Sequence, residues 1–121
     1  MKRGDVVRVA TGSGFGGKPR PALVVQADEF DTPDTVIVAL FTSEVGSGEP
    51  ARPTFDPSAW NVLREKSSLM VDIVVTARRW NVSEAIGRLS REELVRAERA
   101  LLTALGFASD PRPLTSRGAD D

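Results

Sequence analysis

The chain has 121 residues, a net charge of -1 and 40% hydrophobic residues, which together predict one globular domain with its own core. It contains no cysteine, histidine or tyrosine, so disulfides, thiolate nucleophiles, serine-histidine-carboxylate hydrolases and histidine-ligated metal centres are excluded. Any catalysis must therefore use Arg, Lys, Asp, Glu, Ser or Thr side chains. The longest apolar runs have the length of strands, so we expect no membrane segment and a cytoplasmic protein.

Hydrophobic patterns predict six short strands and one late helix. The strands are expected at residues 6–10, 20–27, 35–41, 52–55, 67–76 and 86–89. An acidic turn over residues 28–34 lacks the spacing of a calcium loop. Ser90 and Glu93 form a capping box that begins a helix over about Arg91-Leu105, and Gly106 ends it. The pattern predicts a mainly β (α+β) domain over residues 1–107 and a disordered tail over 108–121.

A glycine-rich loop over residues 11–17 leads into Lys18, Pro19, Arg20 and Pro21. Its glycine spacing matches nucleotide-binding fingerprints, but the two prolines exclude the helix that such loops require. Because the prolines fix an extended backbone on either side of Arg20, its guanidinium is predicted to stand at the mouth of the second strand. A guanidinium can bind a phosphodiester through two parallel hydrogen bonds. The alternative is an ordinary charge at a strand edge.

Polar groups also occur at the end of the third predicted strand and inside the fifth. Thr42 and Ser43 close the third strand, where their hydroxyls either face a groove or satisfy the local backbone. Asp72 lies on the opposite face of the fifth strand from an apolar set predicted to share one face: Leu69, Val71, Ile73 and Val75. A carboxylate there is costly without a partner, and Arg20 is a candidate.

Both tryptophans of the chain lie outside the predicted strands. Trp80 follows Arg78 and Arg79 in a basic and aromatic patch, which is either a binding site for single-stranded RNA or a plain surface loop. Trp60 precedes the fifth strand and is predicted to pack in the core or at an interface.

Several short motifs follow one another along the chain: RGDVV at residues 3–7, KPRPALVV at 18–25, VALFTS at 38–43, NVL at 61–63, SSLMVD at 67–72 and IGRLS at 86–90. In order and spacing they closely resemble the MazF/PemK family of ribonuclease toxins from bacterial toxin-antitoxin pairs. The resemblance extends over about residues 3–107.

The resemblance implies a small SH3-like β-barrel of five to seven strands with a C-terminal helix. It implies a homodimer that cleaves single-stranded RNA without a metal or other cofactor and is inhibited by a small, acidic, partly disordered antitoxin of the MazE type. It assigns catalysis to Arg20, Thr42 and Asp72, with Asp72 as an orienting group. RNA binding is predicted at Phe15, Gly17, Lys18, Pro19, Ser43, Arg78 and Arg79.

Two alternatives remain open. The related CcdB toxins share the barrel but poison DNA gyrase through residues near the carboxy terminus, and a non-catalytic SH3-like module would use the same residues only for packing. Phe15, Met70 and Ile73 stand where many family members have polar residues, so the resemblance does not carry over a cleavage sequence.

Overall fold

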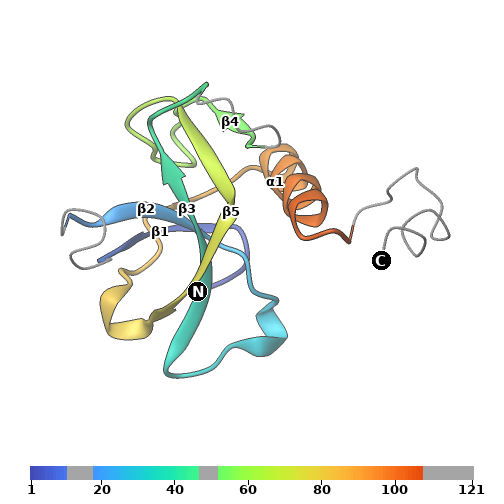
Figure 1. Cartoon of the computed structure of the whole chain (residues 1–121). Helices are drawn as coiled ribbons and strands as arrows, with labels where there is room; N and C mark the ends of the chain where they lie inside the picture. The colour runs from blue at the N-terminus through green and yellow to red at the C-terminus, as the bar shows by residue number, and fades with distance from the viewer. Residues whose placement is uncertain (11–17, 47–51, 108–121) are drawn as a thin grey trace, which may run out of the picture.

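The computed structural model describes residues 1–10, 18–46 and 52–107 (Figure 1). This part of the chain contains six strands, β1 (Asp5–Val9), β2 (Arg20–Val24), β3 (Thr35–Thr42), β4 (Thr54–Phe55), β5 (Ser67–Arg78) and β6 (Gly87–Arg88). They form one antiparallel sheet in the order β4-β5-β3-β2-β1-β6. Every predicted strand is present, although β2, β4 and β6 are shorter than expected and β5 is longer.

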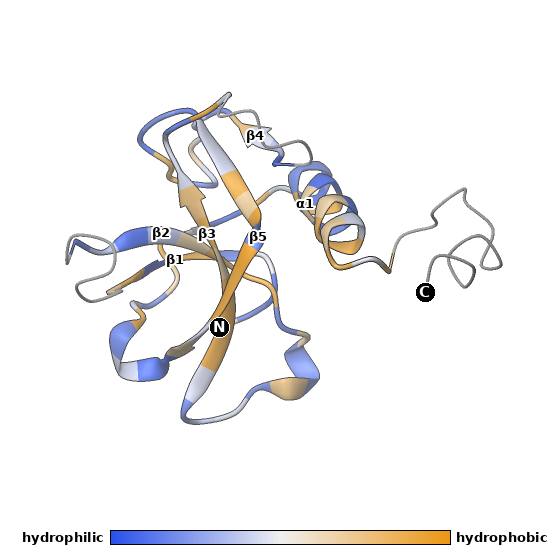
Figure 2. Cartoon of the chain, in the orientation of Figure 1, coloured by the Kyte–Doolittle hydropathy of each residue, from blue (hydrophilic) through white to orange (hydrophobic). Residues whose placement is uncertain are grey.

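The sheet curls into a half-barrel, and α1 (Arg91–Ala104) packs beside β5 (Figure 1). The 12-residue β5 and the eight-residue β3 form the long central ladder, and they are among the most hydrophobic parts of the chain (Figure 2). After β5 the chain comes back to β1, where Val82 forms an antiparallel bridge with Val9. The prediction of a mainly β, barrel-like fold with a C-terminal helix is therefore confirmed.

The helix begins and ends as its sequence predicts. The Ser90 hydroxyl accepts the Glu93 N–H at 3.1 Å, and a Glu93 carboxylate oxygen accepts the Ser90 N–H at 2.9 Å, which completes the capping box. Gly106 adopts a φ of +80°, the left-handed conformation that ends many helices. The apolar periodicity of the helix predicts that Leu105 lies on a buried stripe with Ala97 and Leu101, which was wrong for Leu105, because it is 57% exposed.

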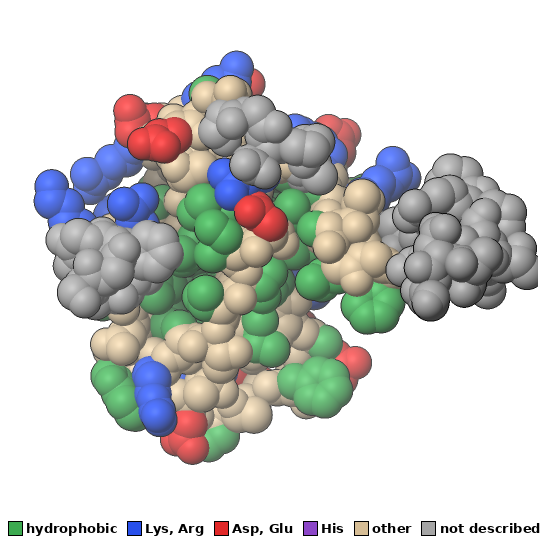
Figure 3. Space-filling model, viewed as in Figure 1, with side chains coloured by type: hydrophobic (Ala, Val, Ile, Leu, Met, Phe, Trp, Pro, Cys, Tyr) green, Lys and Arg blue, Asp and Glu red, His purple; other side chains and the backbone are tan. Residues whose placement is uncertain are grey.

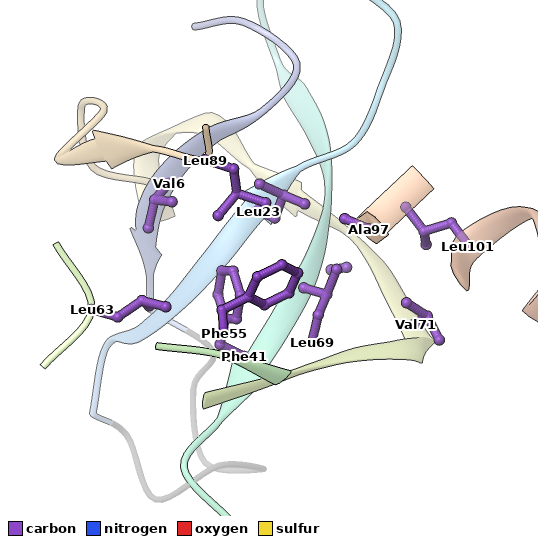
Figure 4. Close-up of a cluster of buried hydrophobic side chains, with 11 residues drawn as sticks. Val6, Leu23, Phe41, Phe55, Leu63, Leu69, Val71, Leu89, Ala97 and Leu101 are labelled. Carbon is purple, nitrogen blue, oxygen red and sulfur yellow. The ribbon is translucent and has the colours of Figure 1, made fainter. Parts of the chain in front are cut away.

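Two hydrophobic clusters occupy the two faces of the sheet. One lies between the sheet and α1 and includes Phe41, Phe55 and Leu101 (Figure 4). The other contains residues of β1, β2, β3 and β5: Val7, Val9, Ala22, Val24, Val36, Val38, Leu40, Met70 and Ala77.

The alternation predicted for β5 was wrong because the β3–β5 ladder changes register. Ala39 pairs with Val74, whereas Phe41 pairs with Leu69, so β5 contains extra residues between these pairs. A bulge with an odd number of extra residues exchanges the two faces of a strand. The predicted single face is consequently divided, with Leu69 and Val71 in the cluster under α1 and Ile73 and Val75 against the other cluster.

Among the described residues, no helix is both long and apolar enough to span a bilayer. The acidic turn of residues 28–34 contains a short 3-10 helix, η2 (Asp28–Phe30), and a second, η3 (Arg79–Asn81), follows β5. Phe15, Gly17 and the tail over 108–121, for which RNA contacts and disorder were predicted, lie outside the described residues.

Candidate active site

Arg20 and Thr42 lie at the same end of two neighbouring strands. In the β2–β3 ladder Ala22 pairs with Leu40. The β2–β3 ladder ends at this pair, so Arg20 and Thr42 each lie two residues beyond it. The sheet therefore places these two predicted site residues at the same end of adjacent strands, although they are far apart in the sequence.

The Thr42 hydroxyl is oriented by the chain that follows it. Its Oγ1 accepts a hydrogen bond from the Glu44 N–H at 3.1 Å. A hydroxyl that accepts one bond in this way can still donate its own hydrogen. The Thr42 hydroxyl thus keeps its hydrogen as a donor for a further partner. Ser43, the next residue, is exposed.

Arg20 borders a pocket of about 220 Å³ that is rich in arginine. Its backbone pairs with Val9 of β1, as the flanking prolines favour, and its side chain is half-buried. The pocket is also lined by Arg8 and Arg64, and by Pro19, Pro21, Phe41, Ser43, Val62, Leu63, Glu65, Ser67 and Ile86. Lys18, which lies two residues before Arg20 in the chain, is exposed. Three guanidinium groups around one hollow favour a ligand with negative charge, such as a phosphate.

Arg8 and Arg64 were not predicted as site residues. Arg8 lies inside a strand, opposite Pro21, and Arg64 lies in the segment before β5. Their only sequence signal is an arginine beside apolar residues, which many surface strands share. The pocket becomes visible only when the β1–β2 hairpin and residues 62–65 are placed together.

Asp72 pairs with Arg52 and not with Arg20, so that predicted ion pair was wrong. The Arg52 Nε and Nη2 atoms donate to the two carboxylate oxygens of Asp72, each at 2.8 Å. The Arg52 side chain is 15% exposed and that of Asp72 47% exposed. The hydrogen bonds from Arg52 hold the pKa of Asp72 below its ordinary value of 3.8. Asp72 is consequently ionised at neutral pH and is a weak proton acceptor.

The pairing of β4 with β5 explains why Arg52 is the partner. Thr54 pairs with Ser68, and Arg52 precedes β4 on the same edge of the sheet. A correct prediction of that short edge pairing would have placed Arg52 near Asp72. Arg20 instead lies beyond β3, which separates β2 from β5.

Arg78 and Arg79 have different environments although they are adjacent. Arg79 is half-buried and bound to the acidic turn, because its Nη2 donates to Asp31 Oδ1 and its Nε to the Thr35 carbonyl at 3.4 Å. Arg78 is exposed, and its guanidinium lies 5.2 Å from the centre of the Trp80 ring. Of the two arginines, Arg78 is therefore the one available to a ligand.

The segment after β5 returns to the sheet beside β1, the strand whose Val9 pairs with Arg20. The Ala10 N–H donates to the Asn81 carbonyl at 2.8 Å, and Val9 bridges Val82. A pocket of about 240 Å³ is lined there by Val9, Leu40, Arg78 and Asn81, together with Ala10, Val75, Thr76 and Ala77. Figure 3 shows hydrophobic side chains over β3 and β5, with Lys and Arg side chains around the margins of that face.

Across residues 1–10, 18–46 and 52–107, no three Asp or Glu side chains converge where a metal ion could bind. The acidic turn of residues 28–34 instead supplies partners for basic groups. Asp28 accepts the Arg3 N–H at 2.8 Å, and Asp31 pairs with Arg79.

Comparison with known proteins places the chain in a family. The family described as "PemK-like, MazF-like toxin of type II toxin-antitoxin system" matches residues 2–105. The chain is 39% identical over 108 residues to a probable endoribonuclease MazF of Mycolicibacterium smegmatis, covering 89% of this chain and 99% of that protein.

Solved structures share the fold. A mycobacterial endoribonuclease in complex with its cognate antitoxin is 20% identical with a TM-score of 0.73, covering 91% of this chain and 99% of that one. A MazE-MazF complex from Deinococcus radiodurans is 20% identical with a TM-score of 0.67, covering 89% of this chain and 97% of that one. With the family match over nearly all described residues, the chain belongs to the PemK-like and MazF-like toxins of type II toxin-antitoxin systems.

Proposed function

We propose that this toxin is an endoribonuclease that cleaves single-stranded RNA and that Arg20 and Thr42 are its catalytic residues. The observation that carries the proposal is the arginine-rich pocket at Arg20, which is also lined by Phe41 and Ser43, the two neighbours of Thr42 in the chain. The relative of 39% identity, a probable endoribonuclease, supports the same reaction. The ribose 2'-hydroxyl would lose its proton and attack the adjacent phosphorus, the P–O5' bond would break, and the leaving 5'-oxygen would take up a proton, giving a 2',3'-cyclic phosphate and a 5'-hydroxyl with no net change in protons.

Each polar group has a role in this reaction that follows from its charge. Arg20 neutralises the phosphate and stabilises the additional negative charge of the phosphorane. Thr42 donates a hydrogen bond to a phosphate oxygen. Asp72, for which the resemblance implies an orienting role, is held ionised by Arg52 and does not line the Arg20 pocket, so this proposal gives it no proton transfer and no contact with the phosphate at Arg20. Because the nucleophile belongs to the substrate, alignment and charge stabilisation supply the catalysis and no metal is required.

The proposed partners follow the structural relatives, two of which are complexes with an antitoxin. We expect a homodimer and a small acidic MazE-like antitoxin whose carboxylates lie against Arg20 and the exposed Arg78. Lys18, Pro19 and Ser43 would contact RNA beside the pocket, and Phe15 and Gly17 would do so from the preceding loop. The proposed compartment is the cytoplasm, where messenger RNA is translated.

The test is incubation of the purified toxin with a long single-stranded RNA in EDTA, followed by mapping of the cut ends. The proposal requires discrete cuts that end in 2',3'-cyclic phosphate and are lost in Arg20→Ala and Thr42→Ala. Thr42→Ser should keep measurable activity because it keeps the hydroxyl. Arg99→Ala and Thr103→Ala, on α1, are matched controls expected to cut like the wild type.

Urea unfolding of each variant separates lost chemistry from lost structure. If the folded, antitoxin-free toxin leaves RNA intact, the ribonuclease proposal is wrong. Gyrase-dependent DNA damage in cells that express the toxin would then identify a CcdB-like poison.

A further inference from the structure

Trp60 is 64% exposed, which excludes the first of its two predicted positions, the core, and leaves the second, an interface. The Arg88 guanidinium lies 5.7 Å from the centre of its ring, within the range of a cation-π contact. A hollow of about 390 Å³ opens between Trp60 and the first turn of α1, where Arg88, Leu89, Ser90 and Arg91 also line it. A large aromatic surface and two guanidinium groups thus border one space.

The Trp60 backbone is held in place by its contact with β6. The Arg88 N–H donates to the Trp60 carbonyl at 2.8 Å, and a Cβ on Gly87 would come within 2.6 Å of that same oxygen. Only glycine allows this close approach of two backbones. The adjacent Asn61 is completely buried and makes four side-chain hydrogen bonds. Trp60 is therefore an exposed ring on a fixed backbone.

The same two segments also border the Arg20 pocket. Residues 62–65 and Ile86 line that pocket, whereas Trp60 and Arg88 line the hollow beside α1. The two spaces consequently lie on either side of the contact between Gly87 and residues 60–62. Arginines border both of them, with Arg8, Arg20 and Arg64 on one side and Arg88 and Arg91 on the other.

We infer that Trp60 and Arg88 form an accessory RNA subsite, which binds a nucleotide flanking the one cut at Arg20. The inference rests on the proposed ribonuclease function. A base stacks on the exposed face of Trp60, while Arg88 and Arg91 bind the phosphates on either side of it. Stacking on an aromatic residue is tolerant of base identity, so this subsite contributes affinity for longer RNA more than sequence choice.

The kinetic test compares two substrates that contain the mapped cleavage sequence, one with long flanks on both sides and one trimmed to the minimal cut sequence. We expect Trp60→Ala and Arg88→Ala to raise KM for the long RNA about tenfold, the order of a lost stacking contact. Both should leave kcat and the KM of the short RNA unchanged. Trp60→Phe should retain most of the affinity. Phe30→Ala, which removes another exposed ring, is the control.

Equal losses on the long and short RNAs would assign Trp60 a structural role and overturn the inference, as would no loss on either. A binding measurement is independent of cleavage. In Trp80→Phe the remaining tryptophan is Trp60, because the chain has two. Titration with a single-stranded DNA 12-mer, which lacks the attacking hydroxyl, should quench its fluorescence, and Arg88→Ala should weaken the quenching.

The binding measurement also separates the two proposals. If the toxin cuts RNA but the DNA leaves Trp60 fluorescence unchanged, the subsite is refuted and the ribonuclease stands. If Trp60 is quenched while no RNA is cut, the nucleic-acid subsite stands and the ribonuclease proposal fails.

Discussion

Asn61 offers the sharpest test of how the walls of both pockets are held. Its side chain is fully buried and makes four hydrogen bonds. The Oδ1 atom accepts the Ser58 N–H at 2.9 Å and the Leu63 N–H at 3.0 Å. The Nδ2 atom donates to the Asp56 carbonyl at 2.9 Å and to the Glu93 carboxylate at 3.1 Å. One amide thus joins residues 56–63 to the start of α1.

The cost of Asn61→Ala can be worked from these bonds. Each intramolecular hydrogen bond contributes about 1 kcal/mol net, and a buried group left unpaired costs roughly 1–3 kcal/mol. Ser58 and Asp56 are exposed and can bind water instead, so their share of the loss is small. Leu63 is buried, and its N–H has less access to water. We therefore expect a loss of roughly 3 kcal/mol in the free energy of unfolding.

Urea unfolding followed by circular dichroism measures this loss. Ser58→Ala is the matched control, because its hydroxyl accepts the Trp60 and Asn61 N–H groups at an exposed position. It should cost less than about 1 kcal/mol, the usual net value of one such bond. A loss below about 1 kcal/mol for Asn61→Ala would refute the reasoning, since it would mean that water replaces all four bonds.

Three further outcomes are expected. Arg52→Gln should destabilise the protein by less than about 1 kcal/mol at pH 7, because the pair is partly exposed. Since the pKa of Asp72 is lowered in the folded state, the contribution of this pair is lost as pH falls through that pKa, so the difference between wild type and variant in urea should shrink toward the acid end of the titration. Val62 has a φ of +57°, which strains the backbone of a β-branched residue. Val62→Gly should therefore raise the melting temperature, and a lower melting temperature would show that this backbone is not strained. Gly87→Ala should lower the melting temperature and weaken the quenching of Trp60 by DNA, because its Cβ would meet the Trp60 carbonyl at 2.6 Å.

Local patterns were sufficient to predict much of the fold. The strands, the capping box of Ser90 and Glu93 and the helix stop at Gly106 depend on neighbouring residues, which a sequence displays directly. The extended backbone at Arg20 likewise follows from its two prolines. The family resemblance, confirmed by the match over residues 2–105, added the overall topology.

Features that depend on distant pairings could not be predicted in this way. The register change between Ala39 and Phe41 divides the apolar face of β5, and periodicity alone assumes an unbroken strand. The partner of Asp72 depends on which strand occupies the next place in the sheet, and that strand is the two-residue β4. Trp60 is exposed because its segment turns outward around the buried Asn61, an arrangement set by bonds to Asp56 and Glu93.

The distribution of ion pairs explains how a chain of net charge -1 can still attract RNA. Among the described residues, three ion pairs join Arg3 to Glu98, Arg52 to Asp72 and Arg79 to Asp31. These pairs lie away from the Arg20 pocket, so their acidic partners neutralise arginines elsewhere on the surface. Arg8 and Arg64, which line that pocket, take part in none of the three. Three arginines and one acid, Glu65, thus line the proposed phosphate site, so its local charge is positive even though the total charge is slightly negative.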